Sequence, residues 1–267
     1  MARQVSRREL LWGVGGGALG VPLGLYSYHS YATASMEWPS APLPASTQAP
    51  PPVGDVSYAQ SGEDIIVGYI LRLLRVKNVT YLDIGAYKPI FLNNTYYFYQ
   101  KGLRGVLVEP NTSLAESLRS VRPEDTTLVA GIGLTAEAEA DYYLMSDPAW
   151  NTFSKEEAEH MQEATKGDVS IQKIVKMPLL DVNDVIAEHF GGEAPTFVSI
   201  DAEGLHEAIL KKIDYDRFRP KVICIETLVS GTANTIPTIP AFMKKVGYVM
   251  CGSTFVNSIF VDAKLFS

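Results

Sequence analysis

The chain has 267 residues, of which 46% are apolar and 20% are charged, and its formal net charge is −7. This composition excludes a disordered chain, a collagen-like fibre and a small scaffold held by disulfides. The acidic balance argues against non-specific binding to duplex DNA, which needs a basic surface, so we expect no nucleic-acid partner. The two cysteines, Cys224 and Cys251, both lie in apolar runs, and we expect buried thiols at both positions.

The N-terminal segment has the layout of a targeting sequence. Arginines precede an uncharged, glycine-rich apolar run over residues 10–25, and the small triplet Ala32-Thr33-Ala34 follows. This order is typical of an export signal, and residues 6–11 resemble a twin-arginine signal. Residues 1–34 are therefore expected to be an export signal or, alternatively, a membrane anchor that associates with the bilayer through residues 10–31.

A proline-rich stretch comes next. Six of the 16 prolines lie in residues 39–52, which is typical of an extended tether that cannot pack a core. We assign residues 35–56 to a linker and residues 57–267 to one globular domain. This domain is expected to be membrane-associated or exported, and a cytoplasmic location is the alternative if the N-terminal segment directs no targeting.

Strand and helix patterns alternate in the first half of the domain. Apolar residues recur at helical spacing over residues 65–74, and Ser61 is placed to cap that helix. A strand over residues 142–145 is expected outside the repeat. The repeat itself predicts strands over residues 79–83, 105–109 and 126–130, and a helix over residues 114–121.

The second half continues the alternation. Ser154-Lys155-Glu156-Glu157 is a capping box that opens a polar helix to about Thr165. Apolar strands that alternate with helices build a parallel sheet covered on both faces. The last two strands, joined by Gly252-Ser253-Thr254, are expected to form an antiparallel hairpin. The predicted helices cover residues 181–190, 205–213 and 239–246, and the predicted strands cover 196–201, 222–226, 248–251 and 256–261.

Acidic residues end four of the predicted strands, namely Asp83, Glu109, Asp201 and Glu226. In an open parallel sheet, ligands bind at the carboxyl ends of the strands. Gly85, just after the first strand, lets backbone approach a bulky ligand, whereas an acid there repels a pyrophosphate. Glu109 can accept hydrogen bonds from both hydroxyls of a ribose. A positively charged cofactor that contains a ribose and no phosphate is S-adenosylmethionine. An NAD-dependent oxidoreductase is disfavoured, because its fingerprint is absent after the first strand.

Eight sequence blocks carry a family resemblance. They are YAQSGED (58–64), YLDIGA (81–86), NNT (93–95), KGLRG (101–105), VEPN (108–111), NTFS (151–154), SIDAEG (199–204) and PKVICIET (220–227). In content and order they resemble the FkbM family of class I S-adenosylmethionine-dependent methyltransferases, over nearly the whole domain. The resemblance implies an α/β fold: a Rossmann-like, mostly parallel seven-stranded sheet with a C-terminal antiparallel hairpin and helices on both faces. It also implies methyl transfer, usually to a hydroxyl of a sugar, glycan or polyketide product.

The resemblance further implies a set of cofactor-binding residues. The sequence departs from the family pattern at Tyr87-Lys88-Pro89, where a small residue is common. A Lys88 ammonium that points inward would weaken the binding of a cationic cofactor. The implied positions are Asp83, Gly85 and Ala86 at the methionine end, Glu109 at the ribose with Asn111 beside it, Gln60 and Glu63 over the cofactor, and Gly133 after the third strand, where the adenine usually lies.

Asp201 and Glu203 are the candidate catalytic residues. Asp201 ends the strand beside the reactive end of the cofactor, so we expect it to be the base or to orient the acceptor, with Glu203 second. The alternative is that both carboxylates bond the helix start at Gly204-Leu205. A divalent ion held by Asp201 and Glu226 would suit their hard oxygen ligands, but nothing in the spacing demands one, and we assign no metal ligands.

Two functions from different classes follow. The first is a methyltransferase that O-methylates a hydroxyl of a sugar, glycan or related small molecule, with residues 145–177 contributing to the acceptor pocket. The second is a membrane-tethered, catalytically inactive module that keeps the fold and holds a glycan or another partner. The acids at all four strand ends favour the first. The export-like N-terminus favours the second, because we expect no S-adenosylmethionine supply outside the cytoplasm.

Overall fold

The structure, a computed structural model, describes residues 54–229 and 234–266. The predicted signal or anchor over residues 1–34 and nearly all of the predicted linker over residues 35–56 lie outside the described residues, and those predictions stay open. Within the described part of the chain, no helix combines the length and the apolar character that crossing a bilayer requires.

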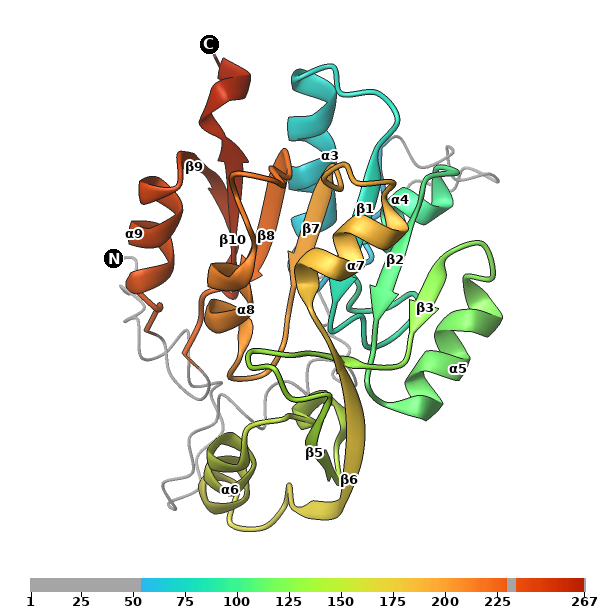
Figure 1. Ribbon diagram of the computed structural model, residues 1–267, viewed down its shortest axis with the longest axis vertical. Helices are drawn as coiled ribbons and strands as arrows, with labels where there is room; N and C mark the ends of the chain where they lie inside the picture. Colours follow the sequence, from blue (N-terminus) through green and yellow to red (C-terminus); the bar gives the residue numbers. More distant parts are fainter. Residues whose placement is uncertain (1–53, 230–233, 267) are drawn as a thin grey trace, which may run out of the picture.

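Seven strands form the main sheet, in the order β3-β2-β1-β7-β8-β10-β9 (Figure 1). The first five strands in this order pair in parallel, and β10 runs antiparallel to both β8 and β9. The predicted fold is thus confirmed, with its mostly parallel sheet and C-terminal antiparallel hairpin. The strands are β1 (Thr80–Ile84), β2 (Arg104–Val108), β3 (Thr126–Leu128), β7 (Phe197–Ile200), β8 (Val222–Glu226), β9 (Tyr248–Ser253) and β10 (Asn257–Asp262).

Helices cover both faces of the main sheet because successive side chains of each buried strand point to opposite sides. In β1, Leu82 and Ile84 join one apolar core, and Tyr81 joins the other. The first core includes residues of α7 (Val182–His189), α8 (His206–Lys212) and α9 (Thr238–Lys245). The second includes residues of α3 (Glu63–Leu73), α4 (Tyr96–Gln100) and α5 (Thr112–Val121).

A smaller layer extends from the main sheet and lies at the lower end of Figure 1. It holds a three-stranded sheet in the order β4-β6-β5, and Met145, Ala158 and Met161 contribute to its own small core. The strand predicted over residues 142–145 is confirmed here as β5, outside the main sheet. The elements of this layer are β4 (Gly131–Ile132), β5 (Glu139–Met145), a short 3₁₀ helix (Pro148–Trp150), α6 (Lys155–Ala164) and β6 (Ile171–Leu180).

Two local predictions are wrong and two hold. Ser61 does not cap α3, because Gly62 occupies the N-cap in a left-handed conformation (φ 89°) and contributes no side chain. Cys251 is exposed rather than buried, because β9 is the edge strand of the sheet and pairs only with β10, whereas Cys224 is buried as predicted. Ser154 caps α6 as predicted, accepting a hydrogen bond from the Glu157 backbone N–H at 3.1 Å. The last described element is a short 3₁₀ helix (Ala263–Phe266).

Candidate active site

A cavity lies at the carboxyl ends of β1, β2 and β7, where the small layer meets the main sheet. The turns at the strand ends contribute Gly85, Glu109, Asp201 and Glu203 to its lining. The small layer contributes residues 148, 149 and 151–153. No lysine, arginine or histidine of the described chain lines this cavity, so its three acids give it a negative character. The lining also includes Gln60, Ile84, Tyr87, Asn94, Val108, Leu114, Ile132, Tyr142, Asn151, Thr152, Phe153 and Asn257.

Gly85 lets the end of β1 meet the turn that follows β7. Its φ is +81°, and a Cβ atom built on it would lie 1.8 Å from the Asp201 carbonyl oxygen. The adjoining backbone is paired as well, since the Asp201 N–H donates to the Ile84 carbonyl at 2.9 Å. Only a residue without a side chain fits this junction. Gly85 therefore positions Asp201 at the cavity wall.

Replacing Gly85 by alanine should destabilise the fold more than the same change at Gly102. Both glycines have a positive φ, at +81° and +80°, but a Cβ atom at Gly102 would meet nothing within 4 Å. The left-handed conformation should cost about 1–2 kcal/mol at both positions. The clash with Asp201 should add about 1–3 kcal/mol at Gly85 alone. Urea unfolding of both variants measures this difference, and equal losses would contradict the close junction.

Glu109 is held by two backbone donors. The Asn111 N–H donates to Oε1 at 2.8 Å and the Tyr87 N–H donates to Oε2 at 2.9 Å, which leaves lone pairs on both oxygens for a ligand. Burial raises the pKa of Glu109 to about 7. The Asn111 side chain is used elsewhere, because its Oδ1 accepts from the Ser113 and Leu114 N–H groups at the start of α5. Asn111 thus fixes Glu109 through its backbone and does not line the cavity.

Asp83 lies beneath the cavity rather than on its wall. It follows Tyr81 on the sheet face that α3, α4 and α5 cover, and it is 3% exposed. The Thr95 hydroxyl donates to Asp83 Oδ2 at 2.7 Å, and the Asn93 amide lies 3.4 Å from the same oxygen. Burial raises the pKa of the Asp83 carboxyl. Asn93 also donates to the Ala86 carbonyl at 2.9 Å. The same amide group therefore holds both Asp83 and the loop that follows β1.

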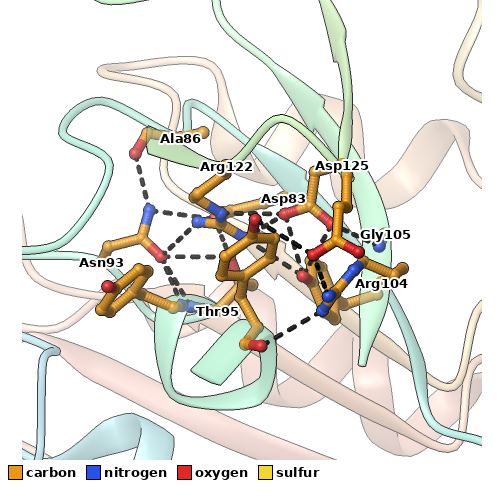
Figure 2. A network of polar contacts seen from close by, with 12 residues as sticks. Asp83, Ala86, Asn93, Thr95, Arg104, Gly105, Arg122 and Asp125 are labelled. Atoms are coloured by element: carbon orange, nitrogen blue, oxygen red, sulfur yellow. Dashed lines mark hydrogen bonds and ion pairs between the residues drawn. The ribbon is translucent and has the colours of Figure 1, made fainter. Parts of the chain in front are cut away.

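Arg122 is the centre of this buried network (Figure 2). Its guanidinium donates to Asp125 at 2.8 Å through Nε, and to Asn93 Oδ1 and Thr95 Oγ1 at 3.0 Å each. The Tyr81 hydroxyl donates to the same Asp125 carboxylate. Arg122 therefore fixes Asn93 and Thr95, two of the side chains that contact Asp83. Nothing in the sequence marked it as a site-supporting residue, because it follows a helix end rather than a strand end.

The segment before α3 is fastened at the rim of the cavity. Glu63 is fully buried and accepts hydrogen bonds from the Thr254 hydroxyl at 2.6 Å and the Asn257 amide at 3.0 Å. Asp64 accepts from the Ser57 hydroxyl and the Tyr58 N–H at 2.6 and 2.7 Å. Of the two predicted covering residues, Gln60 lines the cavity and Glu63 does not. Glu63 instead anchors the segment that carries Gln60.

The remaining predicted cofactor residues, Ala86 and Gly133, lie just outside the lining. Ala86 is 2% exposed and packs in the core shared with α3 and α4. The Gly133 N–H donates to the Leu180 carbonyl at 2.8 Å, whereas its neighbours Gly131 and Ile132 line the cavity. The chain after β3 therefore lines the cavity with Ala130, Gly131 and Ile132, just before the predicted Gly133.

The acids after β7 face the cavity without a helix-capping role. The N-cap of α8 is Leu205, which makes no side-chain capping bond, and no hydrogen bond joins Asp201 or Glu203 to the helix start. The alternative in which the two carboxylates bond the start of this helix is therefore wrong. Burial, together with repulsion from Asp83 and Glu63, raises the pKa of Asp201 to about 6. Burial and the charges of Asp201 and Glu157 also raise the pKa of Glu203.

Lys88 does not line the cavity. Its ammonium lies 5.0 Å from the ring centroid of its neighbour Tyr87, which does line the cavity. The lysine therefore places no charged group on the cavity wall, and the departure from the family pattern leaves the cavity acidic.

Comparison with known proteins assigns the family. The family model for the methyltransferase FkbM domain matches residues 83–250, and no curated protein matches the chain. Among solved structures, a TehB-like S-adenosylmethionine-dependent methyltransferase from Corynebacterium glutamicum is 10% identical, with a TM-score of 0.40 over 76% of this chain and 88% of that one. A precorrin-6y C5,15-methyltransferase from Geobacter metallireducens is 13% identical, with a TM-score of 0.38 over 73% and 85%. A putative caffeoyl-CoA O-methyltransferase from Staphylococcus aureus is 10% identical, with a TM-score of 0.36 over 74% and 82%. The FkbM domain spans more than half of the sequence, and this chain belongs to that family of S-adenosylmethionine-dependent methyltransferases.

Proposed function

We propose that this protein transfers the methyl group of S-adenosylmethionine to a hydroxyl oxygen of a sugar, glycan or related small metabolite. One observation carries the proposal: Glu109, Asp201 and Glu203 line a single cavity that contains no lysine, arginine or histidine among its described lining residues. Such a cavity favours a cationic ligand and disfavours a phosphate. Its carboxylates are also groups that can accept the proton of a hydroxyl, which supports an alcohol as acceptor.

The residues of the cavity fit the cofactor. When bound, S-adenosylmethionine supplies an electrophilic methyl group on a positively charged sulfur. Glu109 keeps free lone pairs for the ribose hydroxyls while its backbone donors hold it in place. Ile84, Val108 and Leu114 offer an apolar wall for the adenine ring. Gln60, at the rim, is the residue we expect to cover the bound cofactor.

Asp201 is the residue we expect to act on the acceptor, and Glu203 supports it. Methyl transfer to oxygen is an in-line displacement, so the protein must align the acceptor and accept its proton. The turn that carries both acids is fixed, because the Asp201 N–H donates to Ile84 and the Thr152 hydroxyl donates to the Glu203 carbonyl at 2.8 Å. A carboxylate on a fixed turn can hold a hydroxyl in one orientation. Asn94 and Asn151, which also line the cavity, offer polar groups to a hydroxyl-rich acceptor.

Titration calorimetry of the full-length chain with S-adenosylmethionine tests the cofactor assignment. We expect saturable binding whose affinity is about tenfold higher at pH 8 than at pH 6, because a Glu109 with a pKa of about 7 is mostly protonated at the lower pH. The ionised carboxylate is the stronger acceptor for ribose hydroxyls. Glu109→Gln should bind more weakly and lose this pH dependence.

Glu116→Gln is the matched control, because Glu116 is an exposed residue of α5, and it should behave as the wild type. A folded wild type that shows no saturable binding would contradict the proposal and favour the inactive binding module. The acceptor class needs a separate assay, in which methyl glycosides and free amino sugars are incubated with cofactor and chain. A mass gain of one methyl group on a hydroxyl supports O-methylation, and methylation of the amines alone overturns it.

A further inference from the structure

Three carboxylates converge beside the cavity. Asp201 and Glu203 follow β7, and Glu226 ends the neighbouring parallel strand β8. One oxygen from each lies within 4.8 Å of the others. Parallel strands bring their carboxyl ends to the same edge of a sheet, which explains why residues separated by 25 positions meet here. The three oxygens could share a single ion.

In residues 54–229 and 234–266, no positive side chain neutralises this cluster. Within the described residues, no lysine or arginine forms an ion pair with any of the three carboxylates. Oε2 of Glu203 and Oε2 of Glu226 are both buried and have no hydrogen-bond partner. Acids placed this closely cannot all ionise without a counter-charge.

His206 supplies a second, independent observation. Its side chain is 5% exposed, its Nδ1 has no hydrogen-bond partner, and this atom lies 3.5 Å from Glu226 Oε2. In metal sites, ligating carboxylates are themselves held by hydrogen bonds from outer partners, and an imidazole N–H is such a donor.

We propose that Asp201, Glu203 and Glu226 bind one divalent cation that prefers oxygen ligands, such as Mg²⁺ or Mn²⁺, and that His206 orients Glu226 by donating from Nδ1. The chemistry of the donor set leads to this choice, because carboxylate oxygens suit hard cations and the cluster contains no thiolate. Asp201 and Glu203 also line the cavity, so the cation would face the acceptor. A role of the cation in methyl transfer rests on the proposed function, whereas the binding of the cation does not.

Titration of the full-length chain with Mn²⁺, followed by the loss of the free-ion electron paramagnetic resonance signal, tests the site. We expect one saturable Mn²⁺ per chain, displaced by excess Mg²⁺. Glu226→Gln should weaken Mn²⁺ binding by more than about tenfold, and His206→Gln should weaken it by about 10- to 100-fold, the usual effect of losing an outer partner. Glu188→Gln and His189→Gln, both at exposed positions of α7, are the matched controls and should bind as the wild type.

The fold of each variant is checked by thermal unfolding without metal, where Glu226→Gln should unfold at the wild-type temperature or above it because it removes a repulsive charge. Glu203→Gln provides a second ligand variant if Glu226→Gln fails to fold. The proposal is overturned if the wild type shows no saturable Mn²⁺ binding, or if folded ligand variants keep wild-type affinity. Binding of S-adenosylmethionine to the same variants is measured by calorimetry without added metal. A variant that loses only the metal site still binds the cofactor, whereas a failure of the proposed function appears as a loss of cofactor binding.

Discussion

Replacing Asp201 by asparagine should lower the turnover number by about 10²- to 10⁴-fold, the range expected for losing a positioned general base. Asparagine keeps the size of the side chain and removes its ability to accept a proton. The turn itself should persist, because it is fixed by backbone bonds from Asp201 and by Thr152. The affinity for S-adenosylmethionine, measured by calorimetry, should therefore change little. Turnover is measured on the methyl glycoside that the wild type methylates fastest.

The control for this change is Asp184→Asn, at an exposed position of α7 away from the cavity lining. It should leave both turnover and cofactor affinity unchanged. Glu203→Gln provides an internal comparison, because Glu203 lines the same wall as the second candidate. If Asp201→Asn binds the cofactor normally and turns over at the wild-type rate, Asp201 has no catalytic role. A larger loss in Glu203→Gln would exchange the roles of the two acids.

Replacing Arg122 by methionine should destabilise the fold by about 3–5 kcal/mol, because it leaves the buried Asp125 carboxylate without its cation. Methionine fills much of the volume of the arginine stem, so lost packing contributes little. Asn93 and Thr95 lose a donor at the same time. These residues also hold Asp83 and the loop after β1, so the loss should reach the cavity wall. Urea unfolding followed by circular dichroism measures the change in free energy.

Arg119→Met is the matched control for Arg122, because both arginines belong to the C-terminal end of the same helix. Arg119 is exposed and makes one hydrogen bond, to the Thr127 carbonyl at 3.1 Å, so its loss should cost about 0.5–1.5 kcal/mol. The double variant of Arg122→Met with Asp125→Asn should recover part of the loss, since it removes the unpaired charge. Similar losses in Arg119→Met and Arg122→Met would refute the central place of Arg122 in the network.

The main-sheet strands and the place of the cavity could be predicted from the sequence because the buried strands are short apolar runs, four of which end in acids. Glu109 and Asp201 were assigned to one site by the rule that parallel strands share a carboxyl edge, and both line the cavity. The strand β6 was missed because its polar residues, such as Lys173 and Lys176, face solvent and interrupt the apolar pattern. The helix α4 was missed because five residues are too few to show a helical period.

The roles of Asp83 and Glu63 were beyond prediction for a different reason. Which face of the sheet Asp83 occupies depends on what packs there, and its partner Thr95 is set by a helix that the sequence did not reveal. Glu63 bonds to Asn257, 194 positions away, and no local pattern can report such a pair. Glu63 was assigned to the cofactor through the resemblance alone, and Asp83 through its place at a strand end as well. Both assignments stay predictions that Asp83→Asn and Glu63→Gln would test.

The position of β10 constrains how the protein is made. The last strand in the sequence lies between β8 and β9 in the sheet, so those two strands have no mutual pairing to form before it arrives. During synthesis β8 must therefore emerge from the ribosome with an open edge, which is a template for mispairing with other chains. The hydrogen bond from Asn257 to Glu63 also forms only after β10 has been made, because Asn257 is the first residue of that strand. The sheet and the rim of the cavity thus close together, in a step that waits for the synthesis of β10.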